Sequence, residues 1–221
     1  NSADAMFFAQ LAGYELGNRL IYMKIFVKEK MKSHIKYMME NTIPVDVIQL
    51  SDRQLEALVR RMEHDKSTYA IIGYSSALER LSKYLDQSNH GVVNANCRAV
   101  IAIAETLNEY TKETMRKYFR APVVSRYSNL ENGIMAQQET NGPGRYLINT
   151  ASYVIEILNI DTDDPVEPGQ TGRIVVTDLF NYGTPLIRYD TGDIGAITQD
   201  PRMPGNLYLA KVEGRMLDLL Y

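Results

Sequence analysis

The chain has 221 residues, of which 45% are apolar, and its 24 basic and 27 acidic side chains give a formal net charge of −3. This apolar content is typical of a folded globular protein and excludes an intrinsically disordered one. The near-neutral charge provides no broad positive surface, so neither duplex nucleic acid nor an anionic membrane is expected as a partner.

Cysteine content and apolar runs bear on the cellular compartment. The single cysteine, Cys97, cannot form a disulfide within the chain and has no neighbouring cysteine for zinc, so we interpret it as a buried structural thiol in a reducing compartment. No apolar run reaches the roughly 18 residues that span a bilayer, and the opening NSADAMFF lacks the basic region of a signal peptide. These features predict a cytoplasmic protein. The abrupt chain ends predict a piece of a longer one.

The first part of the chain alternates between helical and strand patterns. In chain order, the apolar spacing predicts helix 3–15, strand 19–27, helix 28–40, strand 44–50, helix 51–63, strand 68–74, helix 75–84, strand 97–104, helix 108–119 and strand 121–127. Ser51 and Gln54 form a capping-box pattern at the third helix. Short, nearly all-apolar strands between helices predict an α/β fold with a doubly wound parallel sheet.

The pattern changes after residue 141. Short strands without intervening helices are expected at residues 145–149, 153–158, 172–178, 184–190, 193–198 and 207–213. Turn clusters such as DTDDPVEPGQTG and QDPRMPGN separate them. We therefore predict an α/β subdomain over residues 1–141 and a smaller antiparallel, barrel-like β-rich subdomain over residues 142–221.

Several common kinds of site have no support in the sequence. The three histidines, His34, His64 and His90, lie far apart without ligand spacing, and the acids Asp163 and Asp164 lie in a turn where solvated charge is normal. Neither the phosphate loop GxxxxGK[ST] nor the dinucleotide fingerprint GxGxxG occurs. Simple phosphate-cradle classes are therefore disfavoured.

Two segments carry candidate chemistry. Ligands of doubly wound sheets bind beyond the carboxyl ends of the strands, and there YSNLENG offers the ring of Tyr127 and the carboxylate of Glu131, although an ordinary polar turn explains it equally well. In PLIRYDTGD, strand alternation predicts Arg188 and Asp190 on one face, with the Thr-Gly bend presenting Asp193 at the edge. A carboxylate held in this way can accept both hydroxyls of a ribose.

Four segments together resemble the motifs of adenylate-forming ligases, in the family's order. AETL resembles the GE-x-L segment, YSNLENG the YG-x-(T/S)-E adenine motif, GQTGRIVVTDLFNYGTPLIRYDTGD the long stretch that ends in TGD, and EGRMLDLLY the G-R-x-x-D hinge motif. The likeness is to the phenylacetate-coenzyme A ligase type, which includes proteins encoded with capsular polysaccharide genes. It covers residues 104–218, while the first hundred residues match only in pattern.

The resemblance implies roles for individual residues. Tyr127 would stack on adenine, with Ser128 beside it at the nucleotide. Glu131 would act in catalysis by holding Mg²⁺ beside the phosphates. Asp193 would accept the ribose hydroxyls, and Arg215 would approach the ribose or phosphate oxygens as a nucleotide-binding and catalytic group.

The resemblance also implies a reaction and its ligands. Ala104 and Glu105 would border the substrate, Asp218 would lie at the hinge, and the nucleotide would lie where the two subdomains meet. In the family, a carboxylic acid attacks the α-phosphorus of ATP, pyrophosphate leaves, and the acyl-adenylate passes to a thiol such as coenzyme A. ATP or AMP, Mg²⁺ and coenzyme A are therefore the expected ligands, with positioning and electrostatics carrying most of the catalysis. The identity of the acid stays open.

The sequence departs from the family pattern at several positions. Ser128 replaces a glycine, Leu130 replaces the Thr or Ser whose hydroxyl would contact phosphate, Asp190 stands where close relatives have Arg, and Leu217 where the hinge often has Asp. The family's Ser/Thr/Gly-rich phosphate loop and its C-terminal domain with the catalytic lysine are absent from these 221 residues. We therefore expect the chain by itself to be unable to form an adenylate.

Two alternatives remain open. Leu130 and Asp190 favour a degenerate nucleotide-binding scaffold of a polysaccharide pathway that keeps the fold but not the catalysis. A sugar-nucleotide enzyme of the doubly wound type is weakened by the missing glycine fingerprint.

Overall fold

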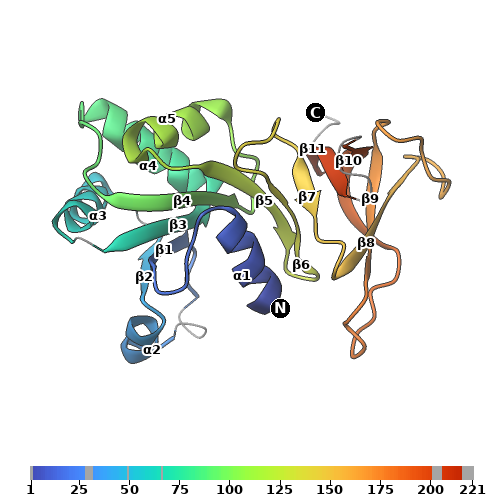
Figure 1. Cartoon of the computed structure of the whole chain (residues 1–221), viewed down its shortest axis with the longest axis horizontal. Helices are drawn as coiled ribbons and strands as arrows, with labels where there is room; N and C mark the ends of the chain where they lie inside the picture. Colours follow the sequence, from blue (N-terminus) through green and yellow to red (C-terminus); the bar gives the residue numbers. More distant parts are fainter. Residues whose placement is uncertain (1, 28–31, 49, 66, 201–205, 216–221) are drawn as a thin grey trace. The chain divides into compact units, whose positions relative to one another are not determined.

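The computed structural model describes residues 2–27, 32–48, 50–65, 67–200 and 206–215, with Arg215 described by its backbone alone. These residues form two compact units (Figure 1). One unit, Met6–Ser125, is called here the parallel unit. The other, called the antiparallel unit, consists of the described residues before Met6 and after Ser125.

The parallel unit is built on a parallel sheet in the order β2-β1-β3-β4-β5. Its strands are β1 (Arg19–Lys24), β2 (Thr42–Asp46), β3 (Thr68–Tyr74), β4 (Asn96–Ile103) and the first part of β5 (Val123–Asn129). This arrangement confirms the parallel α/β sheet predicted from the short apolar runs between helices.

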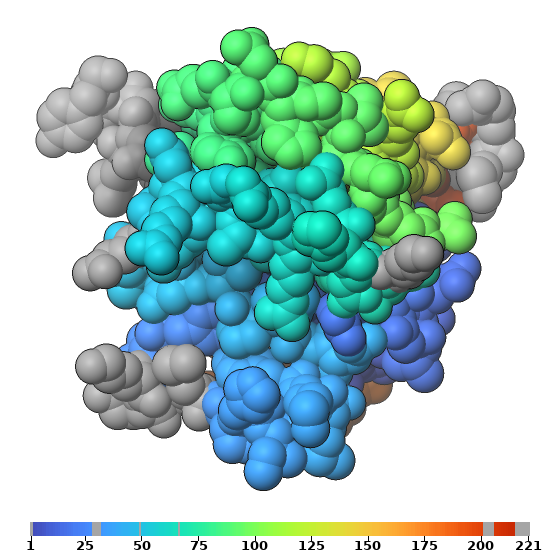
Figure 2. Space-filling model, turned by 90° about the vertical axis from the view of Figure 1, so that its left-hand side faces the viewer, coloured from blue at the N-terminus to red at the C-terminus, as the bar shows by residue number. Residues whose placement is uncertain are grey.

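Helices cover both faces of this sheet (Figure 1). The described helices are α1 (Ser2–Leu11), α2 (His34–Met39), α3 (Asp52–His64), α4 (Ser75–Gln87) and α5 (Glu109–Phe119), of which α2 lies beside the β2 edge rather than on a face. Helices α3, α4 and α5 pack their apolar stripes on one face, and Ala9 and Ala12 of the α1 segment pack on the other face against Ala70 and Ala99. Figure 2 views the unit from the side on which α3 lies, with α2 at its lower edge.

The helix boundaries follow local chemistry. Helix α1 ends before the predicted residue 15 because Gly13 adopts a φ of 106°, and a Cβ there would lie 2.8 Å from the carbonyl oxygen of Arg98. Helix α3 begins where the capping pattern predicts, because Gln54 Oε1 accepts the backbone N–H of Ser51 at 2.9 Å. For the predicted helix 28–40, residues 28–31 lie outside the described part of the chain.

Cys97 lies on β4 with its side chain buried. Burial raises the pKa of its thiol to about 12. The thiol is therefore protonated at neutral pH, as expected for a structural cysteine.

The antiparallel unit continues from the second part of β5 in the order β5-β6-β7-β11-β10-β9-β8. Its other strands are β6 (Gly133–Gln138), β7 (Tyr146–Ile148), β8 (Tyr153–Leu158), β9 (Gly172–Asp178), β10 (Tyr189–Gln199) and β11 (Leu207–Arg215). All neighbouring pairs are antiparallel, which confirms the predicted β-rich region. An apolar cluster that includes Met135, Ile155 and Ile174 forms its core.

The division between the units differs from the boundary predicted near residue 141. Residues Val123 to Ser125 of β5 pair in parallel with β4, whereas Arg126 to Asn129 pair antiparallel with β6. The sequence prediction did not include β6, because YSNLENG was interpreted as a turn that leads out of the parallel sheet rather than as a hairpin turn into a further strand. The antiparallel unit therefore begins at Arg126, inside a strand.

The end of helix α3 provides a pH-dependent contribution to stability. Asp65 accepts bonds from the Ser67 hydroxyl at 2.6 Å and from the Ser67 N–H at 2.9 Å, and it pairs with Arg19. The Ser67 hydroxyl, followed by the other partners, lowers the pKa of Asp65 from 3.8 to about 2. A depressed folded-state pKa adds stability above the unfolded value of 3.8, and this stability is lost as the pH falls toward 2.

We therefore expect Asp65→Asn to flatten the dependence of stability on pH in acid. Urea unfolding midpoints measured between about pH 6 and pH 2 should fall less in this variant than in the wild type. Glu113→Gln, which removes an exposed carboxylate paired with Arg116, is the control and should follow the wild-type curve. A variant curve parallel to that of the wild type would contradict the prediction.

Candidate functional site

Tyr127 lies in the second part of β5, where it pairs with Ala136 of β6. Its side chain is 9% exposed and belongs to the apolar cluster of the antiparallel unit. The register shifts between Tyr127 and Ser128, so that Ser128 pairs with Ile134 and is half-buried. Ser128 follows Tyr127 directly in the chain, one residue before the end of β5.

Asp193 is held by a tight bend within β10. Gly192 adopts a φ of 77°, and its N–H donates to Asp190 Oδ1 at 2.9 Å. The N–H of Asp193 donates to Thr191 Oγ1 at 3.2 Å. Residues other than glycine rarely adopt this backbone conformation. The Thr-Gly pair of the motif therefore sets the position of the following carboxylate.

The structure brings Tyr127 and Asp193 together although they lie 66 positions apart. The phenol oxygen of Tyr127 is 2.7 Å from Asp193 Oδ2 and 3.2 Å from Thr191 Oγ1. Burial, and then the charge of Asp193, raises the pKa of Tyr127 well above its usual value. The phenol is therefore protonated at neutral pH, and its O–H donates a hydrogen bond to the carboxylate.

Arg215 also lies next to this pair along the sheet. Its backbone on β11 is the register partner of Asp193 on β10. Two of the groups expected at a ribose, the aspartate and the arginine, thus come from adjacent positions on neighbouring strands. Asp218, the expected hinge residue, lies outside the described residues.

Glu131 lies on the turn between β5 and β6, exposed to solvent. It borders an open cleft of about 760 Å³ within the antiparallel unit, together with Asp4, Asp178 and the exposed side chain of Leu130. Within the described ranges, no three His, Cys, Asp or Glu side chains are grouped to hold a metal ion. A protein-only metal centre is therefore not formed by these residues, whereas Mg²⁺ commonly binds through one or two carboxylates and substrate phosphates.

Ala104 and Glu105 follow β4 in the parallel unit. The Glu105 carboxylate accepts the N–H of Ser76 at 2.7 Å and its hydroxyl at 3.1 Å, and the Glu105 carbonyl accepts the Ser75 hydroxyl at 2.8 Å. These bonds place a negative charge at the N-terminus of α4, which the helix dipole favours. Glu105 thus has a helix-capping role, and its expected contact with substrate stays a prediction.

Ala104 adopts a left-handed backbone conformation with a φ of 69°. A non-glycine residue in this region costs about 1 kcal/mol relative to glycine. The motif that AETL resembles has glycine at this position, so Ala104→Gly is expected to raise the free energy of unfolding by about 1 kcal/mol. Chemical denaturation would measure the change.

The matched control for this prediction lies two residues earlier. Ala102 is buried on β4, where glycine adds backbone freedom and removes packing, so Ala102→Gly should destabilise the protein by about 0.5–1 kcal/mol. If Ala104→Gly lowers the stability as much as Ala102→Gly does, then the left-handed backbone at Ala104 does not destabilise the protein.

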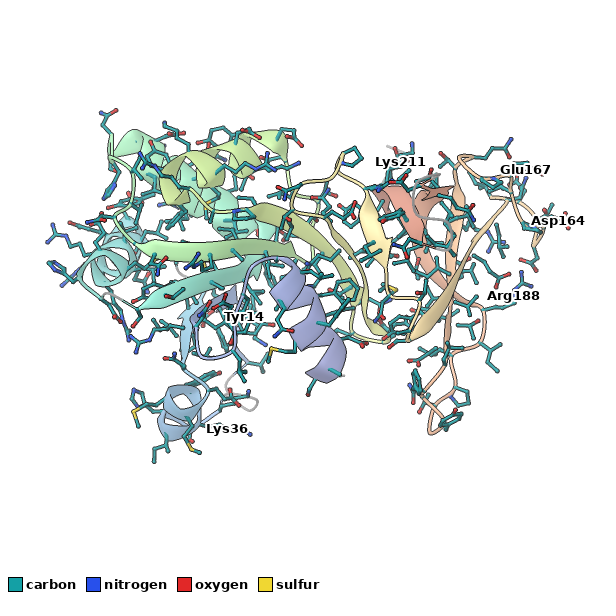
Figure 3. All side chains as sticks on the ribbon, in the orientation of Figure 1. Tyr14, Lys36, Asp164, Glu167, Arg188 and Lys211 are labelled. Carbon is teal, nitrogen blue, oxygen red and sulfur yellow. The ribbon has the colours of Figure 1, made fainter. Side chains whose placement is uncertain are left out.

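The structure corrects the expected placement of Arg188 and Asp190 on one strand face. Residues 184–188 do not form a strand, and Arg188 has a φ of 49°, which breaks the alternation. Arg188 pairs with Glu156 at 3.2 Å, at the edge of the unit near the turn that carries Asp164 (Figure 3). Asp190 instead pairs with Arg173, so both charges of the motif have protein partners.

Sequence reasoning missed two groups near the predicted residues. Thr191 contacts both Tyr127 and Asp193, and the threonine in the TGD pattern was the available signal. Asp4 accepts bonds from Asn149 at 2.8 Å and from Ser152 at 3.0 Å. No local pattern could have revealed the second group, because Asp4 lies 145 positions from Asn149.

The sequence and the structure of the chain were compared with those of known proteins. No protein-family model matches the chain. It is 23% identical over 200 residues to protein CapK of Staphylococcus aureus, an alignment that covers 88% of this chain and 42% of CapK. Its structure resembles a 2-hydroxyisobutyryl-CoA ligase solved in complex with 2-HIB-AMP and CoA, with a TM-score of 0.75, 17% identity, and coverage of 96% and 46% of the two chains.

The chain has the fold of the adenylate-forming ligase superfamily. MatB of Rhodopseudomonas palustris shares this fold, with a TM-score of 0.59, 15% identity, and coverage of 94% of this chain and 43% of MatB. The adenylate-forming fold therefore extends over nearly all of the chain. The chain spans less than half the length of each of these three proteins. In the described residues, no helix is long and apolar enough to cross a bilayer.

Proposed function

We propose that this chain supplies the adenosine-binding part of an AMP-forming ligase. The whole protein would activate a carboxylic acid as its acyl-adenylate and pass the acyl group to a thiol such as coenzyme A. The observation that carries the proposal is the contact between Tyr127 and Asp193, at 2.7 Å, within a fold shared with acyl-CoA ligases. The phenol oxygen of one expected motif and the carboxylate of the other thereby meet at one place, where a single nucleoside could bind.

Each remaining residue has a proposed role in this reaction. Asp193 accepts the ribose hydroxyls, and Arg215, its register partner, reaches the ribose or phosphate oxygens. Ser128 lies beside the nucleotide. Ala104 and Glu105 border the acid, and Asp218 serves as the hinge.

The exposed carboxylate of Glu131 fits a magnesium ion that arrives with ATP, because such an ion needs few protein ligands. When bound, Mg²⁺ would neutralise charge on the phosphate oxygens. Since Glu131 lies on the turn that directly follows β5, its position is tied to that of Tyr127.

The pathway and the cellular compartment are proposed from one observation each. A role in capsular polysaccharide biosynthesis is proposed from the resemblance of the motifs to ligases encoded with capsular polysaccharide genes. The buried, unpaired thiol of Cys97 is compatible with the reducing cytoplasm. The shorter length relative to the ligases supports the expectation that residues 1–221 alone form no adenylate.

One observation favours a second function, a nucleotide-binding scaffold without catalysis. Leu130 stands where the family's hydroxyl residue would contact phosphate, and its side chain is fully exposed. A leucine cannot donate a hydrogen bond, so a phosphate at this turn would lack that partner. Such a protein would bind the nucleotide but would not accelerate adenylate formation.

The natural protein that contains this chain can be tested by exchange of radioactive pyrophosphate into ATP with a panel of carboxylic acids. Exchange that depends on one acid supports the ligase. ATP binding without exchange for any acid supports the scaffold. Titration with nucleotide sugars tests the sugar-nucleotide alternative, and absence of ATP binding together with nucleotide-sugar binding would overturn the proposal.

A further inference from the structure

The hydroxyl group of Tyr127 lies in a small hydrogen-bonded group with Thr191 and Asp193. Thr191 Oγ1 donates to the carbonyl oxygen of Ile174 at 2.9 Å and accepts the N–H of Asp193 at 3.2 Å. A hydroxyl carries one proton, and that of Thr191 is therefore committed to Ile174. The Tyr127 proton is directed to the nearer acceptor, Asp193 Oδ2, at 2.7 Å rather than to Thr191 at 3.2 Å.

This bond restrains the rotation of the Asp193 carboxylate. The N–H bond to Thr191 positions the backbone of Asp193, and the phenol is a partner that orients its side chain. Each carboxylate oxygen has two lone-pair directions, so Oδ2 can accept from Tyr127 and from a ligand at once. Two vicinal hydroxyls bind a carboxylate well only when both of its oxygens face them, which makes the restrained rotation a form of preorganisation.

The ring of Tyr127 has little free surface. Its side chain is 9% exposed and packs in the apolar cluster with Met135, Ala136 and Ile174. A base stacks on an aromatic ring only where one face is open to it. The hydroxyl end of Tyr127, through Asp193, is therefore the part of the residue that is best placed to affect a ligand.

We propose that Tyr127 is a positioning residue that acts on the nucleotide through its hydroxyl group. By orienting Asp193 toward a pair of vicinal hydroxyls, it makes the site select ribonucleotides over 2′-deoxyribonucleotides. The inference rests on the proposed function and refines it. It differs from the stacking role that the family resemblance implies, because it assigns the effect to the phenol oxygen rather than to the ring.

The test is calorimetric titration of the natural protein that contains this chain with AMP and with 2′-deoxy-AMP. The wild type should bind AMP on the order of tenfold more tightly than 2′-deoxy-AMP, as expected for one hydrogen bond to a charged group. Tyr127→Phe keeps the ring and should weaken AMP binding about tenfold while changing 2′-deoxy-AMP binding less than about threefold. The variant would therefore no longer bind AMP more tightly than 2′-deoxy-AMP.

The control removes a different buried phenol oxygen from the same unit. Tyr208→Phe breaks a contact with Glu139 at 3.4 Å and should leave both affinities unchanged. Calorimetry reports the number of sites separately from the affinity, so partial misfolding of Tyr127→Phe lowers the stoichiometry without imitating a loss of selectivity. In Asp193→Ala, adding Tyr127→Phe should have no further effect on AMP binding, because the hydroxyl acts through the carboxylate.

Three outcomes separate this inference from the proposed function. Loss of ribose preference in Tyr127→Phe supports both. Nucleotide binding with ribose preference retained in Tyr127→Phe overturns the inference and leaves the proposed function standing. Absence of adenine nucleotide binding by the wild type overturns both.

Discussion

Replacing Asp193 by asparagine in the natural protein that contains this chain is expected to lower acid-dependent ATP–pyrophosphate exchange by on the order of a hundredfold. The substitution preserves the size of the side chain but replaces one acceptor oxygen with a donor and removes the charge. The remaining oxygen would have to serve Tyr127 and both ribose hydroxyls. Because Tyr127 now bonds Asp193 at 2.7 Å, the amide would turn its oxygen toward the phenol and present the wrong group to the ribose.

Asp190 provides a matched control for this prediction. Asp190→Asn makes the same chemical change three positions earlier in the same bend and keeps an oxygen for the N–H of Gly192. It loses only part of an exposed ion pair with Arg173, so exchange should change less than about threefold. Equal losses in the two variants would show that the bend as a whole, rather than the Asp193 carboxylate, supports activity.

The order of strands and helices was largely predictable because the signals are local. The apolar run TYAIIGY gives β3 over the predicted residues, and the capping pattern at Ser51 marks the beginning of α3. The strand β6 was not predicted, since the Asn-Gly pair of YSNLENG was not interpreted as a hairpin turn. Local patterns also could not show that β5 changes its pairing from parallel to antiparallel at Arg126, because that depends on which strands lie on each side.

The candidate site was predictable where a motif specifies a backbone turn. The Thr-Gly-Asp pattern predicts a bend that presents Asp193, and Gly192 has the positive φ that this bend requires. Side-chain partners were less accessible to sequence reasoning. Arg188 was expected to share a strand face with Asp190, but its own positive φ and its pairing with Glu156 place it elsewhere. Glu105 was expected at the substrate, and its capping of α4 is a contact across 29 positions.

A buried carboxylate provides the largest expected effect on stability. Asp200 is 3% exposed, and its Oδ2 accepts a bond from the Arg145 guanidinium at 2.7 Å. Arg145 also bonds Glu139 at 3.1 Å and lies 3.8 Å from the centre of the Tyr208 ring. Asp200→Ala is therefore expected to lower the free energy of unfolding by about 3 kcal/mol or more, as when one partner of a buried ion pair is removed.

Chemical denaturation of Asp200→Ala measures this loss, and a variant of the exposed Lys211–Glu213 pair is the control. Glu213→Ala should cost less than about 1 kcal/mol, because that pair is screened by solvent. Combining Asp200→Ala with Arg145→Met should restore part of the loss, since the second change removes the cation that has lost one of its two carboxylate partners, Glu139 being the other. If the double variant is less stable than the sum of the two single changes predicts, the guanidinium is held mainly by Glu139 and Tyr208, and the pair with Asp200 is not the principal interaction.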